Sequence, residues 1–497
     1  MAVNTVFFKN SSMIDQLTNM RAKFDALQKQ FDTQKVSTTY AGIGNNRSLD
    51  LSLKQRMNEV GGYQSTIDFV DLRMNVLDST ISRMDDIRSE ARTAIDPNNF
   101  VQQSDGGTNS QTAAKVSLVE LLGLLNSDVG GRQLYGGAKV DTPPVADYDL
   151  IMDGDLTHAG LKQVINEYVQ ADAGPLDNGR LTSSLAGTTV TLAEDGVHDF
   201  GFKIAGVTSD LTNATTTYTA GPPASQDIDF AGQPEVGDSI KVYLDLPDGT
   251  QTTVELHVAE GPGENGGFEL GATPADTAQN FQNALNGALS DKAGSELKAA
   301  SHARGSEAFF DTYQGNPVAR VDGPPFDTAT ATRDGSADTV AWYVGDQSVA
   351  DPRAGSSAVI DDNFTVNYGA RANEDGIREV VQSLAAFVVA DFSSDSEEDH
   401  GFYTAMAERS RAPLQNAEGK TSGIEKIQKE LATTHLAVKR VDERHTTTQN
   451  SLQTAVDDIE GVNVTEVAAQ MLQLKTMMEI SYQTTAIGYQ LSLANYM

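Results

Sequence analysis

Apolar residues near both ends of the chain recur every three or four positions, the spacing of one face of a helix. Between Met13 and Phe31 the pattern is a strict heptad. Between Val464 and Tyr496 it begins as steps of three and four, and from Met471 it drifts towards an eleven-residue repeat. Two long helices are therefore predicted, with contact faces made by Met13, Leu17, Met20, Phe24, Leu27, Phe31, Val464, Val467, Met471, Leu474, Met478, Tyr482, Tyr489, Leu493 and Tyr496.

Two longer patterns lie between these ends. The first runs from about Ser48 to Ile95, about 70 Å at 1.5 Å per residue, with a kink or register change expected at Gly61-Gly62. The second runs from Ile424 to Ile459. Shorter helices are predicted at about 110–126 and 375–390, so both ends of the chain read as helical.

The middle of the chain has a different pattern, because apolar and polar residues alternate there between Gly- and Pro-rich turns. Residues 238–258 predict a β-hairpin around Pro247-Asp248-Gly249. One helix is expected to interrupt this region, with Thr273 as its N-cap and Pro274 at its first position. The middle of the chain is therefore predicted to consist mainly of β-strands.

Together these elements predict an α+β protein, in which a long coiled-coil-like helical bundle built from both chain ends carries an inserted β-rich outer domain. The predicted map is an inner helix at 1–47, half of an outer helical core at 48–140, and the β-rich insert, of one or two subdomains, at 141–365. The other half of the outer core follows at 366–461 and a second inner helix at 462–497.

The net charge also differs between the helical ends and the β-rich middle of the chain. The 497 residues carry a formal net charge of −33, and residues 141–365 alone hold 35 acidic and 10 basic residues, a net charge of −25. Such a field repels nucleic acid and anionic membranes, so neither is expected as a partner. The chain has no cysteine, which excludes disulfides and thiolate chemistry. We also expect no membrane span and no cleaved secretory signal.

The sequence contains only weak candidates for a catalytic, metal or cofactor site. Gly261–Gly266 matches G-x-G-x-x-G, but a dinucleotide site needs a helix directly after the loop, and a hairpin loop is the favoured interpretation. The acidic run Ser393–His400 lacks calcium-loop spacing and is expected to be a solvated linker. His435 and His445 fall on a helix, where packing is favoured over metal ligation. Neither an enzyme nor a cofactor is predicted.

The Thr-rich run 212–219 is interpreted as an unmodified strand, with O-glycosylation as the alternative. The helical faces leave two readings open as well. They could form one intramolecular core, or they could be covered by other copies of the chain. The apolar character of both chain ends favours the second reading.

Several strings resemble the bacterial flagellin superfamily, in particular its hook-associated junction branch. They are LLNSDVGGRQLYGGAKVDTPP at 124–144, WYVGDQ at 342–347, FTVNYGARANEDGIREVVQSLA at 364–385 and ISYQTTAIGYQLSLANYM at 480–497. The resemblance covers about residues 1–140 and 340–497. The Ser-Ser-Gly-x-Arg-Ile-Asn-like turn of filament flagellins is replaced here by TQKVSTTYAGIG, which favours the junction branch over a filament flagellin.

The resemblance implies a self-assembling structural subunit of the extracellular flagellum, with the terminal helices in concentric layers of a tube. It implies export by the flagellar type III apparatus, an export chaperone on the C-terminal helix, and contacts with hook, filament and junction proteins. Alternatives are a main filament flagellin and, more remotely, a surface adhesin or glycan-binding protein that uses the insert. An aromatic-lined groove would support the adhesin, but the aromatic residues of the insert are scattered (Tyr243, Phe309, Phe310, Trp342). A hydrolase within the insert is a third alternative, which no nucleophile or carboxylate constellation supports.

Overall fold

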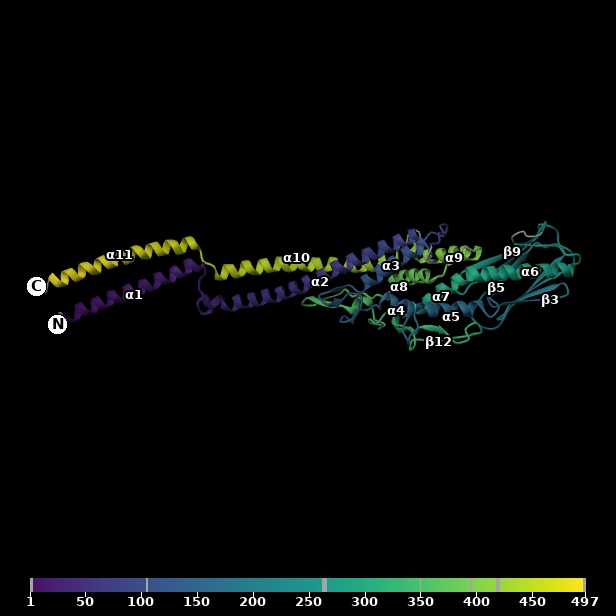
Figure 1. The fold of residues 1–497 in the computed structure, drawn as a ribbon. Coiled ribbons are helices and arrows are strands. Elements are labelled where there is room, and N and C mark those ends of the chain that lie inside the picture. Colours follow the sequence, from purple (N-terminus) through teal and green to yellow (C-terminus); the bar gives the residue numbers. More distant parts are fainter. Residues whose placement is uncertain are drawn as a thin grey trace. The chain divides into compact units, whose positions relative to one another are not determined.

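The computed structural model describes residues 3–103, 106–261, 266–348, 350–393, 396–416 and 421–494, with side chains described outside 3–11, 489 and 491–494. Helices and strands are both abundant, so the predicted α+β class is confirmed (Figure 1). The chain divides into two units. The first comprises Met1–Val70, Val359–Thr365 and Leu436–Met497, and the second Asp71–Ala358 and Val366–His435.

The first unit consists mainly of long helices. It holds α1 (Val3–Thr33), the short helix η1 (Tyr40–Asn46), α11 (Val464–Ala494), the first part of α2 (Arg47–Ala94) and the last part of α10 (Gly423–Glu460). All four long helices predicted from the apolar spacing are observed. Helix α2 continues through Gly61-Gly62 as one element, so the helix is not interrupted there, and the kink or register change stays a prediction.

The second unit contains a group of packed helices. Helix α5 (Leu161–Ala173) packs on α7 (Lys298–Phe310), and α7 also contacts α8 (Asp375–Val389) and α9 (Glu397–Leu414). Helix α3 (Asn109–Leu125) covers α8. The helices predicted at 110–126 and 375–390 are therefore confirmed, and α3 begins with a capping box made by Thr108 and Gln111.

Two four-stranded sheets of the same unit share a core with helix α6 (Pro274–Lys292). The sheet orders are β3-β4-β7-β6 and β10-β9-β8-β5. Buried side chains from both sheets, including Phe230 and Phe268, meet Phe281 of α6. The strands are β3 (Leu181–Ala186), β4 (Thr189–Glu194), β5 (Lys203–Ser209), β6 (Ala214–Thr219), β7 (Ser225–Phe230), β8 (Ser239–Asp245), β9 (Gln251–Val258) and β10 (Gly267–Phe268).

Two local predictions hold in this region. Strands β8 and β9 pair antiparallel, with Asp245 opposite Gln251, so the predicted hairpin is confirmed. Helix α6 has Thr273 as N-cap in a capping box with Asp276, and Pro274 occupies the first turn. The second unit also holds the short helix α4 (Tyr148–Asp153) and two short strand pairs, β1 (Asp128–Val129) with β2 (Arg132–Gln133) and β11 (Ala319–Val321) with β12 (Thr332–Asp334). A further pair, β13 (Ser357–Asp361) with β14 (Phe364–Asn367), has its turn in the first unit.

The expectation of a single helix within 141–365 is wrong, because α4, α5 and α7 also lie there. Helix α7 carries few large apolar residues. Its face towards α5 includes Gly305, where an added Cβ would lie 3.0 Å from the Ile165 Cα, so the two backbones approach closely. Contact faces made of small residues give no hydrophobic periodicity, which is why the sequence pattern missed this helix.

Candidate assembly interface

Helices α1 and α11 lie side by side within the first unit and run in opposite directions (Figure 1). A groove of about 350 Å³ runs between them, with Leu27 of α1 and Leu474 and Met477 of α11 in its walls. Ala26, Lys23 and glutamines complete the lining. The pair is therefore an antiparallel helical hairpin with an incompletely filled seam.

The face of α11 turned to α1 follows heptad spacing. Val467 is buried, Met471, Leu474 and Met478 are half-buried, and the series continues through Ser481 and Thr485. Tyr482, predicted to belong to this face, is 49% exposed. The face of α11 turned to α1 therefore keeps a period of seven, with Ser481 on this face where the predicted eleven-residue repeat has Tyr482.

On α1 the predicted face is also partly covered. Leu17, Met20, Phe24 and Leu27 are half-buried, whereas Met13 and Phe31 are each 41% exposed. The interpretation that partner copies alone cover the terminal seams is thus wrong for its central residues, because each helix shields the other. Among the predicted residues of α11, Val464 is half-buried; the side chains of Tyr489 and Leu493, and all of Tyr496, lie outside the described residues.

A second apolar face on α11 was not predicted. Leu472, Ile480 and Ile487 are 67%, 59% and 54% exposed, although each is a large aliphatic residue. Their spacing of eight and seven residues returns to nearly the same side of the helix. This spacing is visible in the sequence, but the prediction named a single apolar face of this helix and did not include these three residues.

Backbone and ionic contacts fix the base of the hairpin. The Val36 N–H donates to the Glu460 carbonyl at 2.7 Å, and the Val462 N–H donates to the Gln34 carbonyl at 3.1 Å. The Glu460 carboxylate accepts from Lys35 Nζ at 2.7 Å and from Lys54 Nζ. These hydrogen bonds, that from Lys35 first, hold the pKa of Glu460 below its usual value.

The turn between β13 and β14 makes a second polar cluster in the first unit. Asp362 accepts from Tyr63 Oη at 3.0 Å and pairs with Arg56 at 2.8 Å, and these contacts lower its pKa. His445 is buried, stacks on Tyr63 and contacts the Ile360 carbonyl oxygen through Nε2 at 2.8 Å. The packing role predicted for His445 is confirmed.

The remaining motifs do not assemble into a reactive site. In the Gly-rich motif, residues 262–265 lie outside the described residues; Gly267 after it begins strand β10 rather than a helix. Strand β10 pairs parallel with β9, so the hairpin-loop interpretation is also wrong. The adjacent helix N-terminus that pyrophosphate binding requires is thus not there.

The acidic run is partly a helix start rather than a linker. Ser396 caps α9 by accepting from the Asp399 N–H at 3.1 Å, and Glu397 to Asp399 form the first turn, where the helix dipole favours negative charge. Residues 394 and 395 lie outside the described residues. His435 contacts Asp71 at 2.6 Å through Nε2. In the described part of the chain no three His or acidic side chains converge as metal ligands.

The structure shows where the Thr-rich run and the aromatic residues of the insert lie. The Thr-rich run forms the exposed edge strand β6, as expected. Phe309, Phe310 and Trp342 are fully buried, so they offer no aromatic platform for a sugar. A hollow of about 630 Å³ lies between α9 and the β8–β9 turn, and its lining includes Glu296, His400 and Arg409. Arg409 there is paired with Asp248 at 2.8 Å.

Comparison with known proteins gives no family assignment: no family profile matches the chain, and a search of curated proteins finds no match. In the described part of the chain, no helix combines the length and the apolar character needed to cross a membrane.

Proposed function

We propose that this protein is a non-enzymatic, self-assembling structural subunit, and that copies associate through the α1–α11 hairpin. The observation that carries the proposal is the exposed apolar face of α11, where Leu472, Ile480 and Ile487 are each more than half exposed. Large aliphatic residues clustered on one helix face usually mark an interaction site.

The distribution of charge supports the same conclusion. The α1 sequence has four basic and three acidic residues and the α11 sequence one basic and two acidic, so the hairpin has no net charge within a chain of −33. Two copies repel one another over most of their surfaces. The neutral hairpin is the region where they can approach without that penalty.

The resemblance of the helical ends to the flagellin superfamily gives the finer proposal. The protein would belong to the extracellular bacterial flagellum, at the hook–filament junction or in the filament, with hook, filament and junction proteins as neighbours. Export by the flagellar type III apparatus and a chaperone on α11 before assembly belong to the same proposal. An adhesin role receives no support from the buried aromatic residues of the insert.

Negative-stain microscopy and sedimentation of the concentrated protein test the proposal. A filament subunit should give long filaments, and a junction subunit short rings or rapidly exchanging oligomers. A protein that remains monomeric at every concentration, with and without salt, would remove the proposal.

A further inference from the structure

Strand β6 is a sheet edge without the features that usually prevent an edge from pairing. Proteins commonly block such edges with charge, proline, a bulge, short length or a covering element. Among the other edges of the two four-stranded sheets, β10 has two residues, β5 shifts register between Ile204 and Gly206, and β3 packs against α6. Strand β6 pairs with β7 in unbroken register, and Thr215 to Thr219 are all exposed. Its sequence, ATTTYT, contains no charge, glycine or proline.

Alternate residues of β6 direct their backbone groups away from the sheet. The Phe230 N–H donates to the Thr188 carbonyl at 3.1 Å, so the even-numbered residues of β7 bond to the β4 side and the odd-numbered ones to β6. The register then directs the N–H and C=O groups of Thr216 and Tyr218 outwards. In the described part of the chain no second strand pairs with β6, so these groups offer a template for a further strand.

The segment around β6 carries no charge within a strongly acidic region. Residues 211–226 contain no acidic or basic residue, although residues 141–365 hold 35 acidic and 10 basic residues. On the neighbouring strand β7, Asp229 and Asp227 accept hydrogen bonds from threonine hydroxyls of β4 at 3.0 and 2.6 Å, on the side away from β6. A second copy of the chain, which is equally acidic, can therefore approach β6 with less repulsion than it meets over the rest of the insert.

We infer that β6 of one copy pairs antiparallel with β6 of a second copy, about a two-fold axis at Thr217. Thr217 is the midpoint of the exposed residues, so this register faces all of them with one another. Thr216 and Tyr218 of each copy then exchange N–H···O bonds across the axis. On the outer face Thr217 lies opposite Thr217 and Thr215 opposite Thr219, and Thr–Thr pairs are favourable across strands. The strand is therefore complementary to itself.

This contact goes beyond the proposed function, because it uses neither α1 nor α11. A two-fold contact closes on itself and gives a dimer rather than a row. It joins two four-stranded sheets into one continuous sheet that crosses both copies. A single pair of short strands buries less than the ~800 Å² per partner of a stable interface, so we expect a weak, rapidly exchanging dimer.

Cysteine trapping tests the register, because the chain has no cysteine of its own. In the inferred contact the two Thr217 Cα atoms form a non-hydrogen-bonded pair about 4.5 Å apart, within the range of a disulfide. Full-length Thr217→Cys protein should therefore form disulfide dimers on air oxidation at least tenfold faster than Thr215→Cys protein. The two Thr215 residues would be separated by about 13 Å along the strands. Thr215→Cys mixed with Thr219→Cys should give mixed dimers, although neither variant dimerises alone.

Other outcomes of the trapping experiment overturn the inference. Equal rates for Thr217→Cys and Thr215→Cys would indicate random collision or parallel pairing. The absence of disulfide dimers from Thr217→Cys protein would show that this edge is not a contact between copies.

Substitution at Thr216 tests whether backbone pairing holds the dimer. Thr216→Pro removes an outward N–H and leaves the bonds to β7 in place, and proline is tolerated at such positions of edge strands. Added to Thr217→Cys, it should slow disulfide formation at least tenfold while circular dichroism stays unchanged. Thr216→Val keeps the N–H and should leave the rate as it was. An unchanged rate with proline would reject strand pairing.

Ile480→Asp in α11 separates this contact from the proposed assembly through the hairpin. Added to Thr217→Cys, it should leave the disulfide rate unchanged, because the β6 contact does not involve α11. A rate that falls with Ile480→Asp would show that the trapped dimers form only within hairpin assemblies, and would reject an independent two-fold contact. A wild-type chain that never forms larger assemblies would reject the proposed function and leave the disulfide result standing.

Discussion

Single buried side chains decide how this protein responds to acid. His302 of α7 is enclosed by packed residues, its Nδ1 lies 2.8 Å from the Lys298 carbonyl oxygen, and its ring lies against Phe402. Burial lowers its pKa from 6.5 to about 4. The pattern of apolar residues did not predict α7, and nothing in the sequence around His302 reveals this burial.

The His302 shift predicts acid sensitivity. Between pH 6.5 and about 4 the unfolded chain binds a proton at His302 that the folded chain does not, so stability falls as the pH falls, by about 3 kcal/mol over the window. In His302→Gln protein this loss of stability between pH 6.5 and about 4 should be absent. The measurement is the Tm of both proteins from pH 7 to 4. Parallel curves for the two proteins would show that His302 is not the titrating group.

The base of the α1–α11 hairpin gives a second residue-scale prediction. Glu460→Gln removes the ion pairs with Lys35 and Lys54, and because Lys35 is half-exposed the loss should be about 1 kcal/mol or less. Hydrogen exchange should quicken at the Val36 and Val462 amides and stay unchanged in the sheets. Since the Glu460 pKa is lowered, wild-type protection of these amides should be present above pH 4.5 and lost as the pH falls further. Unchanged exchange at both amides would mean that the backbone bonds alone hold the base.

At the scale of elements, the sequence predicted what depends on periodic large residues. The buried series on α2, including Val60, Ile67 and Met74, and the hairpin of β8 and β9 were both readable from spacing. The sequence did not predict the contact through small residues at Gly305, nor did it predict that α11 has two apolar faces. A list of spaced apolar residues does not tell which of two possible partners covers each one.

Two glycines in helices therefore predict opposite effects for the same substitution. At Gly305 a new Cβ would lie 3.0 Å from the Ile165 backbone, so Gly305→Ala should force α5 and α7 apart and cost about 1–3 kcal/mol. At the exposed Gly287 of α6 a new Cβ meets no described atom within 4 Å, so Gly287→Ala should stabilise by about 0.5–1 kcal/mol through helix propensity. Chemical denaturation measures both. Equal effects would show that α5 and α7 can separate freely.

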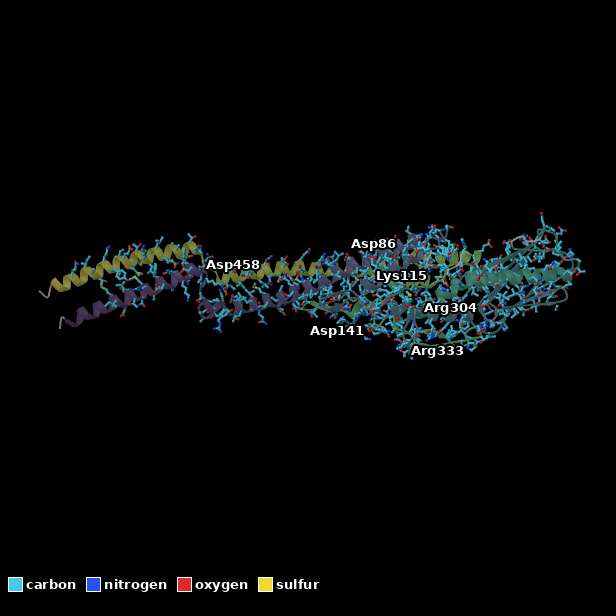
Figure 2. All side chains as sticks on the ribbon, in the orientation of Figure 1. Asp86, Lys115, Asp141, Arg304, Arg333 and Asp458 are labelled. Atoms are coloured by element: carbon cyan, nitrogen blue, oxygen red, sulfur yellow. The ribbon has the colours of Figure 1, made fainter. Side chains whose placement is uncertain are left out.

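At the scale of the whole molecule, the negative charge and the exposed apolar face of α11 lie in different regions of the chain. The acidic residues concentrate in the β-rich middle, whereas α1 and α11 together are neutral. In Figure 2, Arg304 lies on α7 and Arg333 on β12, both in the second unit, and Asp458 lies in the last turn of α10, in the first unit. Under the proposed function, a highly charged exterior keeps free subunits apart, and a neutral apolar hairpin joins them.

This division predicts how assembly responds to salt. If copies meet through apolar faces while −33 charges per chain repel, screening should favour association. Raising the salt from about 0.01 M to about 0.15 M shortens the Debye length from about 30 Å to about 8 Å. The sedimenting fraction at fixed protein concentration should therefore rise several-fold. Assemblies that dissolve as salt is added would show instead that ion pairs hold the copies together, and the apolar face of α11 would lose its assigned role.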